Sequence, residues 1–281
     1  MQLLRKINEL KSILGTDRHN GLSIGFVPTM GALHQGHLSL VDRAASENDR
    51  VVVSIFVNPT QFNDPNDLKN YPRTLETDLS LLSLRSCDYV FHPSVEEMYP
   101  EPDTRKFDFG SLESVMEGKF RLGHFNGVAQ VVSKLFSIVQ PDKAYFGLKD
   151  FQQYSVIKNM VNQLEMPVQL VACDTVREPD GLAMSSRNAL LTKEHRQVAP
   201  QIFRILQEAK SESRAHSPED VRRHVIEKIN SVSLFRLEYF EIVDDSTLKG
   251  VSSWEEEGVK VGCIAVFAGS VRLIDNILFE K

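Results

Sequence analysis

Short apolar segments alternate with amphipathic segments over the first two thirds of the chain, and this alternation restricts the fold more than any other feature. The apolar segments have the length and flanking residues of buried strands, and they lie at residues 22–28, 51–57, 87–92, 142–146 and 167–173. Helical spacing of apolar residues occupies 36–47, 74–85, 127–139 and 150–164. This order predicts an α/β domain whose parallel sheet binds ligands beyond the carboxyl ends of its strands.

From about residue 177 the pattern changes. We expect a helix after Thr192, a second helix capped by Ser217, and strands at 236–243, 260–267 and 270–274. The sequence therefore predicts a Rossmann-like domain over residues 1–176 and a smaller α+β domain over 177–281. Apolar residues at helical spacing over Met1 to Leu14 predict an amphipathic helix rather than a signal peptide.

The stretch from Pro28 to His37 carries the strongest chemical pattern. It follows the first apolar strand and leads into a helix that we expect to begin near Gly36, so His34 and His37 flank a helix N-terminus. Free backbone N–H groups and the helix dipole favour anions there, and the small Gly31 lets a phosphate approach the backbone. The alternative is a pair of exposed turn histidines. We favour a nucleotide phosphate site.

A second polar turn, Ala183 to Asn188, carries consecutive Ser185, Ser186 and Arg187. Hydroxyls and a guanidinium suit a clamp on a polyphosphate. Together, His34-Gln35-Gly36-His37 and Met184-Ser185-Ser186-Arg187 resemble the HIGH and KMSKS signatures of the adenylyl-transferring superfamily that includes class I aminoacyl-tRNA synthetases. Arg187 stands where that superfamily has its second Lys.

Four further motifs lie between these two turns. They are Val57-Asn58-Pro59-Thr60-Gln61-Phe62, Tyr71-Pro72-Arg73-Thr74, Arg121-Leu122-Gly123-His124-Phe125-Asn126-Gly127-Val128 and Phe146-Gly147-Leu148-Lys149-Asp150-Phe151-Gln152-Gln153. In this order they resemble the pantothenate synthetase (pantoate:β-alanine ligase) family from about residue 22 to 190. Leu122 departs from the family pattern, which has Pro there, and the segment Asn63 to Lys69 is less acidic than usual, so we place no metal ligand in it.

The resemblance implies the ATP site and the catalytic groups. The catalytic residues of that family correspond to His37, which would be the proton donor, and to His34 and Lys149. Asp150 suits the ribose hydroxyls, although a solvated helix start is the alternative for the Lys149-Asp150 pair. The ATP-binding residues correspond to Met30, Gly31, Ala32, Leu33, His34, Gln35, Gly36, His37, Gly147, Leu148, Lys149, Asp150, Val176, Met184, Ser185, Ser186 and Arg187.

The resemblance also assigns Gln61 and Gln153 to pantoate, and Gln61 to β-alanine. A neutral amide can bind a carboxylate and hydroxyls without the salt bridge that would favour the ground state. Asp78 is the best carboxylate for Mg²⁺ brought with ATP, but an exposed acid in the first turn of a helix is the reading that we slightly prefer. Arg121, His124 and Asn126 could reach substrate or cap a helix.

Composition restricts the partners. A formal net charge of −6 argues against nucleic acid as the main partner. Cys87, Cys173 and Cys263 are widely spaced, which fits buried thiols in a reducing compartment and no zinc site. No apolar run approaches the roughly 20 residues of a membrane helix. We expect a cytoplasmic homodimer that binds ATP, (R)-pantoate and β-alanine and has no membrane partner.

The predicted activity is therefore an ATP-dependent ligase that forms pantothenate, AMP and pyrophosphate through a pantoyl-adenylate. One alternative is another nucleotidyltransferase, which would share His34 and His37 but would be shorter and lack Gln61 and Gln153. A synthetase acting on tRNA would want a basic appended domain, and none is visible. A nucleotide-binding regulator without turnover would need the phosphate site but not the two glutamines.

Overall fold

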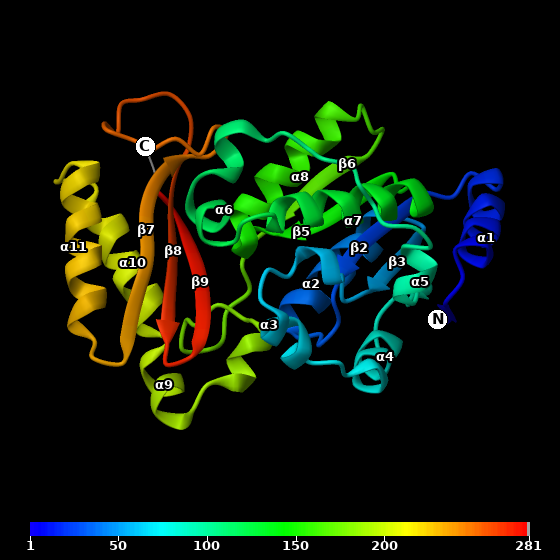
Figure 1. Ribbon diagram of the computed structural model, residues 1–281, viewed down its shortest axis with the longest axis horizontal. Helices are drawn as coiled ribbons and strands as arrows, with labels where there is room; N and C mark the ends of the chain where they lie inside the picture. The colour runs from blue at the N-terminus through cyan, green and yellow to red at the C-terminus, as the bar shows by residue number, and fades with distance from the viewer. Residues whose placement is uncertain (280–281) are drawn as a thin grey trace. The chain divides into compact units, whose positions relative to one another are not determined.

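The computed structural model describes residues 1–279 and contains two compact units (Figure 1). The first unit comprises Met1–Phe109, Arg121–Leu148 and Val156–Asp174. The second comprises Gly110–Phe120, Lys149–Ser155 and the chain from Thr175 onward. Two short segments that precede residue 175 in the sequence thus pack with the C-terminal part of the chain.

The first unit is built on a six-stranded parallel sheet of order β1-β4-β3-β2-β5-β6. The chain runs from β2 to β3 on one side and later returns to β5 on the other, so the strand order reverses beside β2. Ligands bind at such a reversal, beyond the carboxyl ends of the strands. The strands are β1 (Gln2–Leu4), β2 (Ile24–Thr29), β3 (Arg50–Ile55), β4 (Tyr89–Phe91), β5 (Lys143–Gly147) and β6 (Gln169–Cys173).

The edge strand β1 corrects the prediction of a helix from residue 1 to 14. Gln2–Leu4 pairs in parallel with β4, and helix α1 (Ile7–His19) begins only afterwards. The Gln2 N–H donates to the Asp88 carbonyl at 2.8 Å, and Leu4 is buried. Pairing with an otherwise open sheet edge satisfies backbone groups that local helical periodicity could not take into account.

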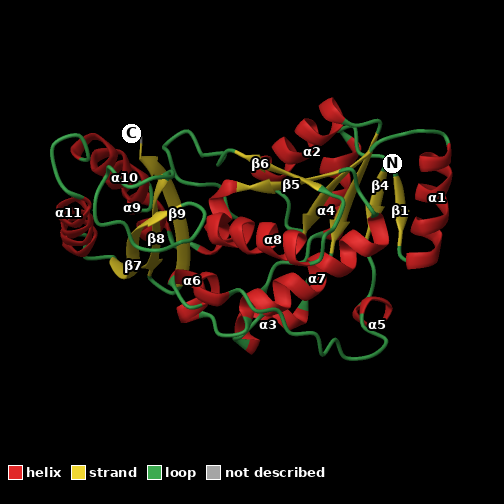
Figure 2. Cartoon of the chain, turned by 90° about the horizontal axis from the view of Figure 1, so that it is seen from above, coloured by secondary structure: helices red, strands yellow, loops and turns green. Residues whose placement is uncertain are grey.

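Helices cover both faces of this sheet, as Figure 2 shows for α2 (Gln35–Glu47) and α7 (His124–Val139). Alternate β3 residues point to one face, where Val51, Val53 and Ile55 share a core with α2 and with Leu82 of α4 (Leu75–Ser83). On the other face Phe26 meets Phe136 of α7 edge to face. Shorter elements are η1 (Pro59–Gln61), α3 (Pro65–Asn70) and α5 (Val95–Met98).

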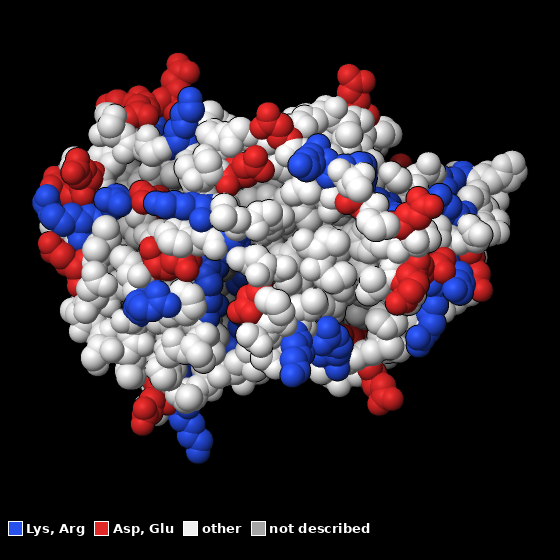
Figure 3. Space-filling model, viewed as in Figure 1, with Lys and Arg blue, Asp and Glu red and all other residues white. Residues whose placement is uncertain are grey.

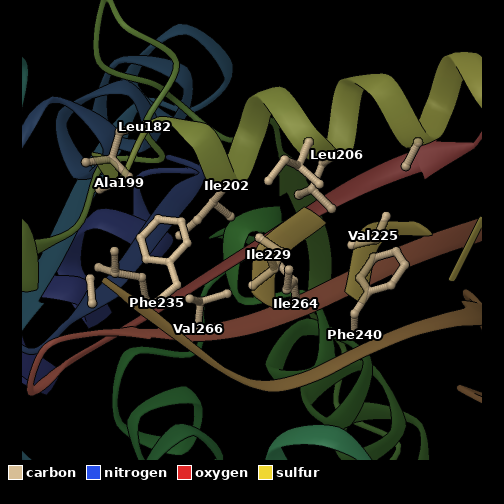
Figure 4. Packing of buried hydrophobic residues seen from close by; sticks show 14 of the residues in the cluster. Leu182, Ala199, Ile202, Leu206, Val225, Ile229, Phe235, Phe240, Ile264 and Val266 are labelled. Carbon is tan, nitrogen blue, oxygen red and sulfur yellow. The ribbon is translucent and has the colours of Figure 1, made fainter. Parts of the chain in front are cut away.

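The second unit contains a three-stranded antiparallel sheet of order β7-β8-β9, formed by β7 (Phe235–Asp244), β8 (Lys260–Ala268) and β9 (Val271–Phe279). Apolar residues of α10 (Gln201–Glu212) and α11 (Pro218–Ser231) cover one sheet face, and Figure 4 shows Leu206 and Ile229 close to Ile264. The cap by Ser217 is confirmed, because its side chain accepts from the Asp220 N–H.

The remaining elements of the second unit are short. They are η2 (Gly110–Glu113), α6 (Met116–Phe120), η4 (Ser186–Leu190) and α9 (Lys193–Val198). Two further elements, η3 (Leu148–Asp150) and α8 (Phe151–Gln163), have residues in each unit. The predicted fold class, a parallel α/β sheet with a smaller α+β domain, is confirmed.

Candidate active site

The turn after β2 is held by side chains on both sides. The Thr29 hydroxyl donates to the Ser54 carbonyl at 2.7 Å and accepts from the Gly31 N–H at 3.1 Å. Gly31 has φ +83°, and a Cβ there would approach Ile55 and the Asp78 carboxylate at 3.0 Å. Glycine is therefore required both by the backbone conformation and by the close packing.

Asp78 is buried at 1% exposure, which corrects the reading of it as an exposed helix acid. Its Oδ2 accepts from the Ala32 N–H at 3.0 Å, and its Oδ1 accepts from the Leu33 N–H at 2.8 Å. Because both oxygens hold the loop, Asp78 fixes the backbone that leads into the histidine pair. Residues 1–279 contain no group of three or more His, Cys, Asp or Glu that could hold a metal ion. The Mg²⁺ role of Asp78 stays a prediction.

His34 and His37 lie side by side at the start of α2, with ring centroids 4.1 Å apart. His34 is the N-cap residue, and its Nδ1 accepts from the Gly36 N–H at 3.1 Å. The His37 Nδ1 accepts in turn from the His34 N–H at 3.3 Å. A neutral imidazole that accepts at Nδ1 carries its proton on Nε2. Both rings therefore carry their proton on Nε2, and they lie at a helix N-terminus, which favours anions.

Gln61 is a buried amide whose orientation is set by its neighbours. Asn58 donates from Nδ2 to the Gln61 Oε1 at 3.3 Å and to the Gly127 carbonyl at 3.1 Å. The Tyr99 hydroxyl donates to the Asn58 Oδ1 at 2.9 Å. The Gln61 Nε2 faces the Met30 sulfur at 3.0 Å, which is a weak acceptor. The amide therefore keeps donor capacity for a ligand beside the loop that carries the histidines.

His124 positions the backbone of Gln61. The His124 Nδ1 lies 2.7 Å from the Gln61 carbonyl, which can only accept, so Nδ1 carries the proton. The Arg121 guanidinium approaches the His124 Nε2 at 3.1 Å. Neither a substrate role nor helix capping, the alternatives drawn from sequence, predicts this contact. The position of His124 at a helix start was the available signal, but its partner is distant in sequence.

Lys149 and Asp150 lie in η3, and Gln153 lies in the first turn of α8; all three belong to the second unit. The Lys149 Nζ lies 3.3 Å from the Asp150 Oδ2, and the Lys149 side chain is only 18% exposed, less than a solvated helix start implies. The Lys149 carbonyl accepts from the Asn276 Nδ2 at 3.0 Å. Within residues 1–279, Gln153 is half-buried and its amide makes no hydrogen bond.

The predicted phosphate clamp follows a narrow turn in which Arg177 bridges to Ala183. The Met184 N–H donates to the Val176 carbonyl at 3.0 Å, which brings these two predicted site residues together. Ser185 caps η4, because its hydroxyl accepts from the Arg187 N–H at 3.2 Å. The clamp residues thus form the start of the short helix η4, where the Arg187 N–H lies beside the Ser185 hydroxyl.

Each unit gathers its own share of the predicted site residues. In the first unit, these residues follow three neighbouring strands of the sheet. The loop with the histidines follows β2, Gln61 follows β3 and contacts Met30 of that loop, and Gly147 ends β5. These residues are Met30, Gly31, Ala32, Leu33, His34, Gln35, Gly36, His37, Gln61, Gly147 and Leu148. The second unit holds Lys149, Asp150, Gln153, Val176, Met184, Ser185, Ser186 and Arg187.

The cysteines do not offer a nucleophile. All of Cys87, Cys173 and Cys263 are free thiols. Cys87 and Cys263 are buried as the sequence predicted, whereas Cys173 is only half-buried, which corrects the prediction for that residue. Burial raises the pKa of the Cys87 thiol to about 12 and raises the pKa of Cys263 as well. Because the thiolate is the reactive form, these groups are inert at neutral pH.

Charge is mixed over the surface in view. Figure 3 shows Lys and Arg residues interspersed with Asp and Glu on one face of the chain. Anions must therefore be attracted by local donors such as the histidine pair. None of the described helices has the length and apolar character needed to cross a bilayer.

Comparison with known proteins identifies a family along the length of the chain. Residues 2–278 match the family model described as pantoate-beta-alanine ligase. The pantothenate synthetase of Porphyromonas gingivalis is 56% identical over 280 residues, and that of Bacteroides thetaiotaomicron is 53% identical over 281 residues, with 100% of each chain covered in both cases.

Solved structures are similar along the same length. The pantothenate synthetase of Thermus thermophilus has a TM-score of 0.94 at 44% identity, with 100% of both chains covered. A pantoate-beta-alanine ligase from Francisella tularensis, complexed with beta-gamma ATP and beta-alanine, has a TM-score of 0.82 at 37% identity, covering 100% of this chain and 98% of that one. The resemblance found in the sequence motifs is thus confirmed, and the chain belongs to the pantoate-beta-alanine ligase family.

Proposed function

We propose that this protein joins pantoate to β-alanine at the expense of ATP and produces pantothenate. The observation that carries the proposal is the pair of Nε2–H donors from His34 and His37 at the N-terminus of α2, where the strand order reverses. This pair suits the phosphates of a nucleotide. The Gln61 amide, in contact with Met30 of the same loop, suits the acid substrate.

The reaction is proposed to take two steps. A carboxylate oxygen of (R)-pantoate attacks the α-phosphorus of ATP, and the bond to pyrophosphate breaks, which leaves a pantoyl-adenylate. The amine of β-alanine, after losing a proton from its ammonium form, then attacks the acyl carbon, and AMP leaves. Mg²⁺ is proposed to arrive on the ATP phosphates as part of the substrate, because no acidic cluster in residues 1–279 would hold it independently.

Donor and cationic side chains are proposed to contact the phosphates of ATP. His37 and His34 would donate to oxygens on which negative charge grows, and Lys149 would add a point charge. Donors aimed at charge that develops in the transition state contribute more to rate than to ground-state binding. Ser185, Ser186 and Arg187 would close on the β- and γ-phosphates, with Arg187 forking onto two oxygens.

The substrate carboxylate would meet neutral groups. Gln61 and Gln153 are proposed to bind the carboxylate and hydroxyls of pantoate, and Gln61 also β-alanine. An amide binds the carboxylate without the salt bridge that would make its attack on phosphorus slower. The half-buried Gln153 amide has no competing partner within residues 1–279, which supports a ligand role. A cytoplasmic location and a homodimer remain part of this proposal.

Labelled pyrophosphate exchange tests the proposal. Purified protein with ATP, Mg²⁺ and pantoate should move labelled pyrophosphate into ATP without β-alanine, and ¹⁸O in the pantoate carboxylate should reach AMP in the complete reaction. A panel of other small carboxylic acids serves as the control. Exchange supported by another acid would indicate a different nucleotidyltransferase, and no exchange with any acid would indicate a regulator without turnover.

A further inference from the structure

Strand β9 has one face toward the apolar core of the second unit and one face away from it. Val271, Leu273 and Phe279 belong to the core beneath α10 and α11. Because successive residues of a strand point to opposite sides, Arg272 and Asn276 belong to the other face. Asn276 is only 8% exposed, so a polar group is buried outside the core. A buried amide or guanidinium costs free energy unless it is hydrogen-bonded, so its partners are informative.

Asn276 contacts η3, the turn that leads into α8. Its Nδ2 donates to the Lys149 carbonyl at 3.0 Å. This bond fixes the backbone of the residue whose ammonium is proposed to contact phosphate. The bond is local to the second unit and joins residues 127 positions apart in the sequence.

Arg272 reaches the same helix through the segment Gly110–Phe120. Its guanidinium donates to both Glu117 carboxylate oxygens at 2.8 and 2.6 Å. The Tyr239 hydroxyl of β7 donates to the same carboxylate at 2.7 Å. The Glu117 N–H donates in turn to the Gln152 Oε1 at 2.9 Å. Gln152 precedes Gln153, so this chain of bonds ends beside the proposed pantoate amide.

Both ends of the Gln152 side-chain amide bond to the segment Gly110–Phe120. Its Nε2 donates to the Leu112 carbonyl at 2.7 Å and to the Val115 carbonyl at 2.9 Å. Gly118 permits the tight packing of the same segment, because a Cβ there would lie 2.0 Å from the Glu113 carbonyl oxygen. The segment is therefore rigidly attached to α8 and to the strands.

Asp275 holds the third segment. Its carboxylate accepts from the Arg177 Nη1 at 2.7 Å and from Nη2 at 2.9 Å. Arg177 also donates to the Gly181 carbonyl at 3.2 Å and stacks on Phe203 at 3.5 Å. The turn fixed in this way leads directly into Met184 and the phosphate clamp.

We infer that Arg272, Asp275 and Asn276 of β9 are positioning residues for the adenylation step, because they hold as one body the segments that carry Gln153, the Ser185–Arg187 clamp and Lys149. The inference rests on the proposed function. Catalytic groups need support that fixes them to within about 0.5 Å, and a displacement of about 1 Å can cost on the order of 10² in rate. Strand β9 thus fixes the positions of Lys149, Gln153 and the Ser185–Arg187 clamp relative to one another.

A double-mutant cycle tests the inference. Asn276→Ala removes the hydrogen bond to the Lys149 carbonyl, so we expect a folded protein whose kcat for pantoate-dependent pyrophosphate exchange falls about tenfold. If Asn276 acts through Lys149, the double variant Asn276→Ala with Lys149→Ala should be no slower than Lys149→Ala alone. Leu278→Ala, on the same face of β9 and 43% exposed, is the matched control and should leave kcat unchanged.

A second cycle covers the clamp. Asp275→Asn combined with Arg187→Ala should be similarly non-additive, and thermal unfolding of each variant shows whether its loss of rate has a folding origin. Additive losses in both cycles, or an Asn276→Ala variant with wild-type kcat, would overturn the inference while the proposed function stands. Wild-type protein that shows no exchange would overturn the proposed function, and the inference with it.

Discussion

Gly127 offers the sharpest test of how the first unit holds Gln61, the proposed substrate amide. A Cβ at this position would lie 2.4 Å from the Thr60 carbonyl oxygen and 2.8 Å from the Gln61 Cα. Both are backbone atoms of η1, so no side chain can rotate away. Since ordinary contact begins at 3.4 Å, η1 and α7 must separate by about 1 Å in Gly127→Ala.

That separation should affect both folding and substrate binding. It would stretch the bond from Asn58 to the Gly127 carbonyl, now 3.1 Å, and the bond from His124 to the Gln61 carbonyl, now 2.7 Å. Overpacking costs about 1–3 kcal/mol of unfolding free energy. A shift of about 1 Å in a group that positions substrate can cost on the order of 10² in kcat/KM. We expect the loss in kcat/KM for pantoate to exceed the loss for ATP.

Urea denaturation and steady-state pyrophosphate release measure the two effects. Gly15→Ala is the matched control, because Gly15 lies inside α1 and a Cβ added there would have nothing within 4 Å. It should stabilise the protein by about 0.5–1 kcal/mol and leave kinetics unchanged. A Gly127→Ala enzyme with wild-type kcat/KM for pantoate would refute the claim that close packing of α7 on η1 sets the position of Gln61.

Four further outcomes are expected. His37→Ala should lower kcat by on the order of 10²–10³ with a smaller change in the KM for ATP, and near-normal kcat would sink its transition-state role. Gln153→Ala should weaken pantoate far more than ATP or β-alanine, whereas equal losses for all three would point to misfolding. Hydrogen bonds from Arg43, then Lys143, lower the pKa of Glu47 to about 2, so its contribution is present above the unfolded pKa and disappears as the pH falls through about 2. Glu47→Gln should therefore lower Tm at pH 7, and the difference from wild type should shrink on acidification; a gap that widens contradicts this. Thiol reagents at neutral pH should label Cys87 only after unfolding, since its pKa is raised to about 12, and rapid labelling of folded protein would refute its burial.

The sequence by itself determined the elements whose signal is local. Apolar runs and helical spacing predicted the parallel sheet from β2 to β6, because a strand or helix face must repeat with its own period to be buried. The same locality placed His34 and His37 at a helix start, since a strand, a glycine turn and an apolar helix follow one another there. The ordered motifs from residue 22 to 190 also indicated the family.

Only the tertiary structure decided the contacts between distant segments. Gln2–Leu4 became a strand because β4 offered an unpaired edge, not because of its own periodicity. Asp78 is buried because its carboxylate holds the loop of residues 46 positions earlier, and His124 meets a carbonyl 63 positions away. Arg272, Asp275 and Asn276 look like ordinary strand residues until their partners are known. A polar side chain gives no sign in sequence of which distant backbone group will satisfy it, so its role appears only when the chain has folded.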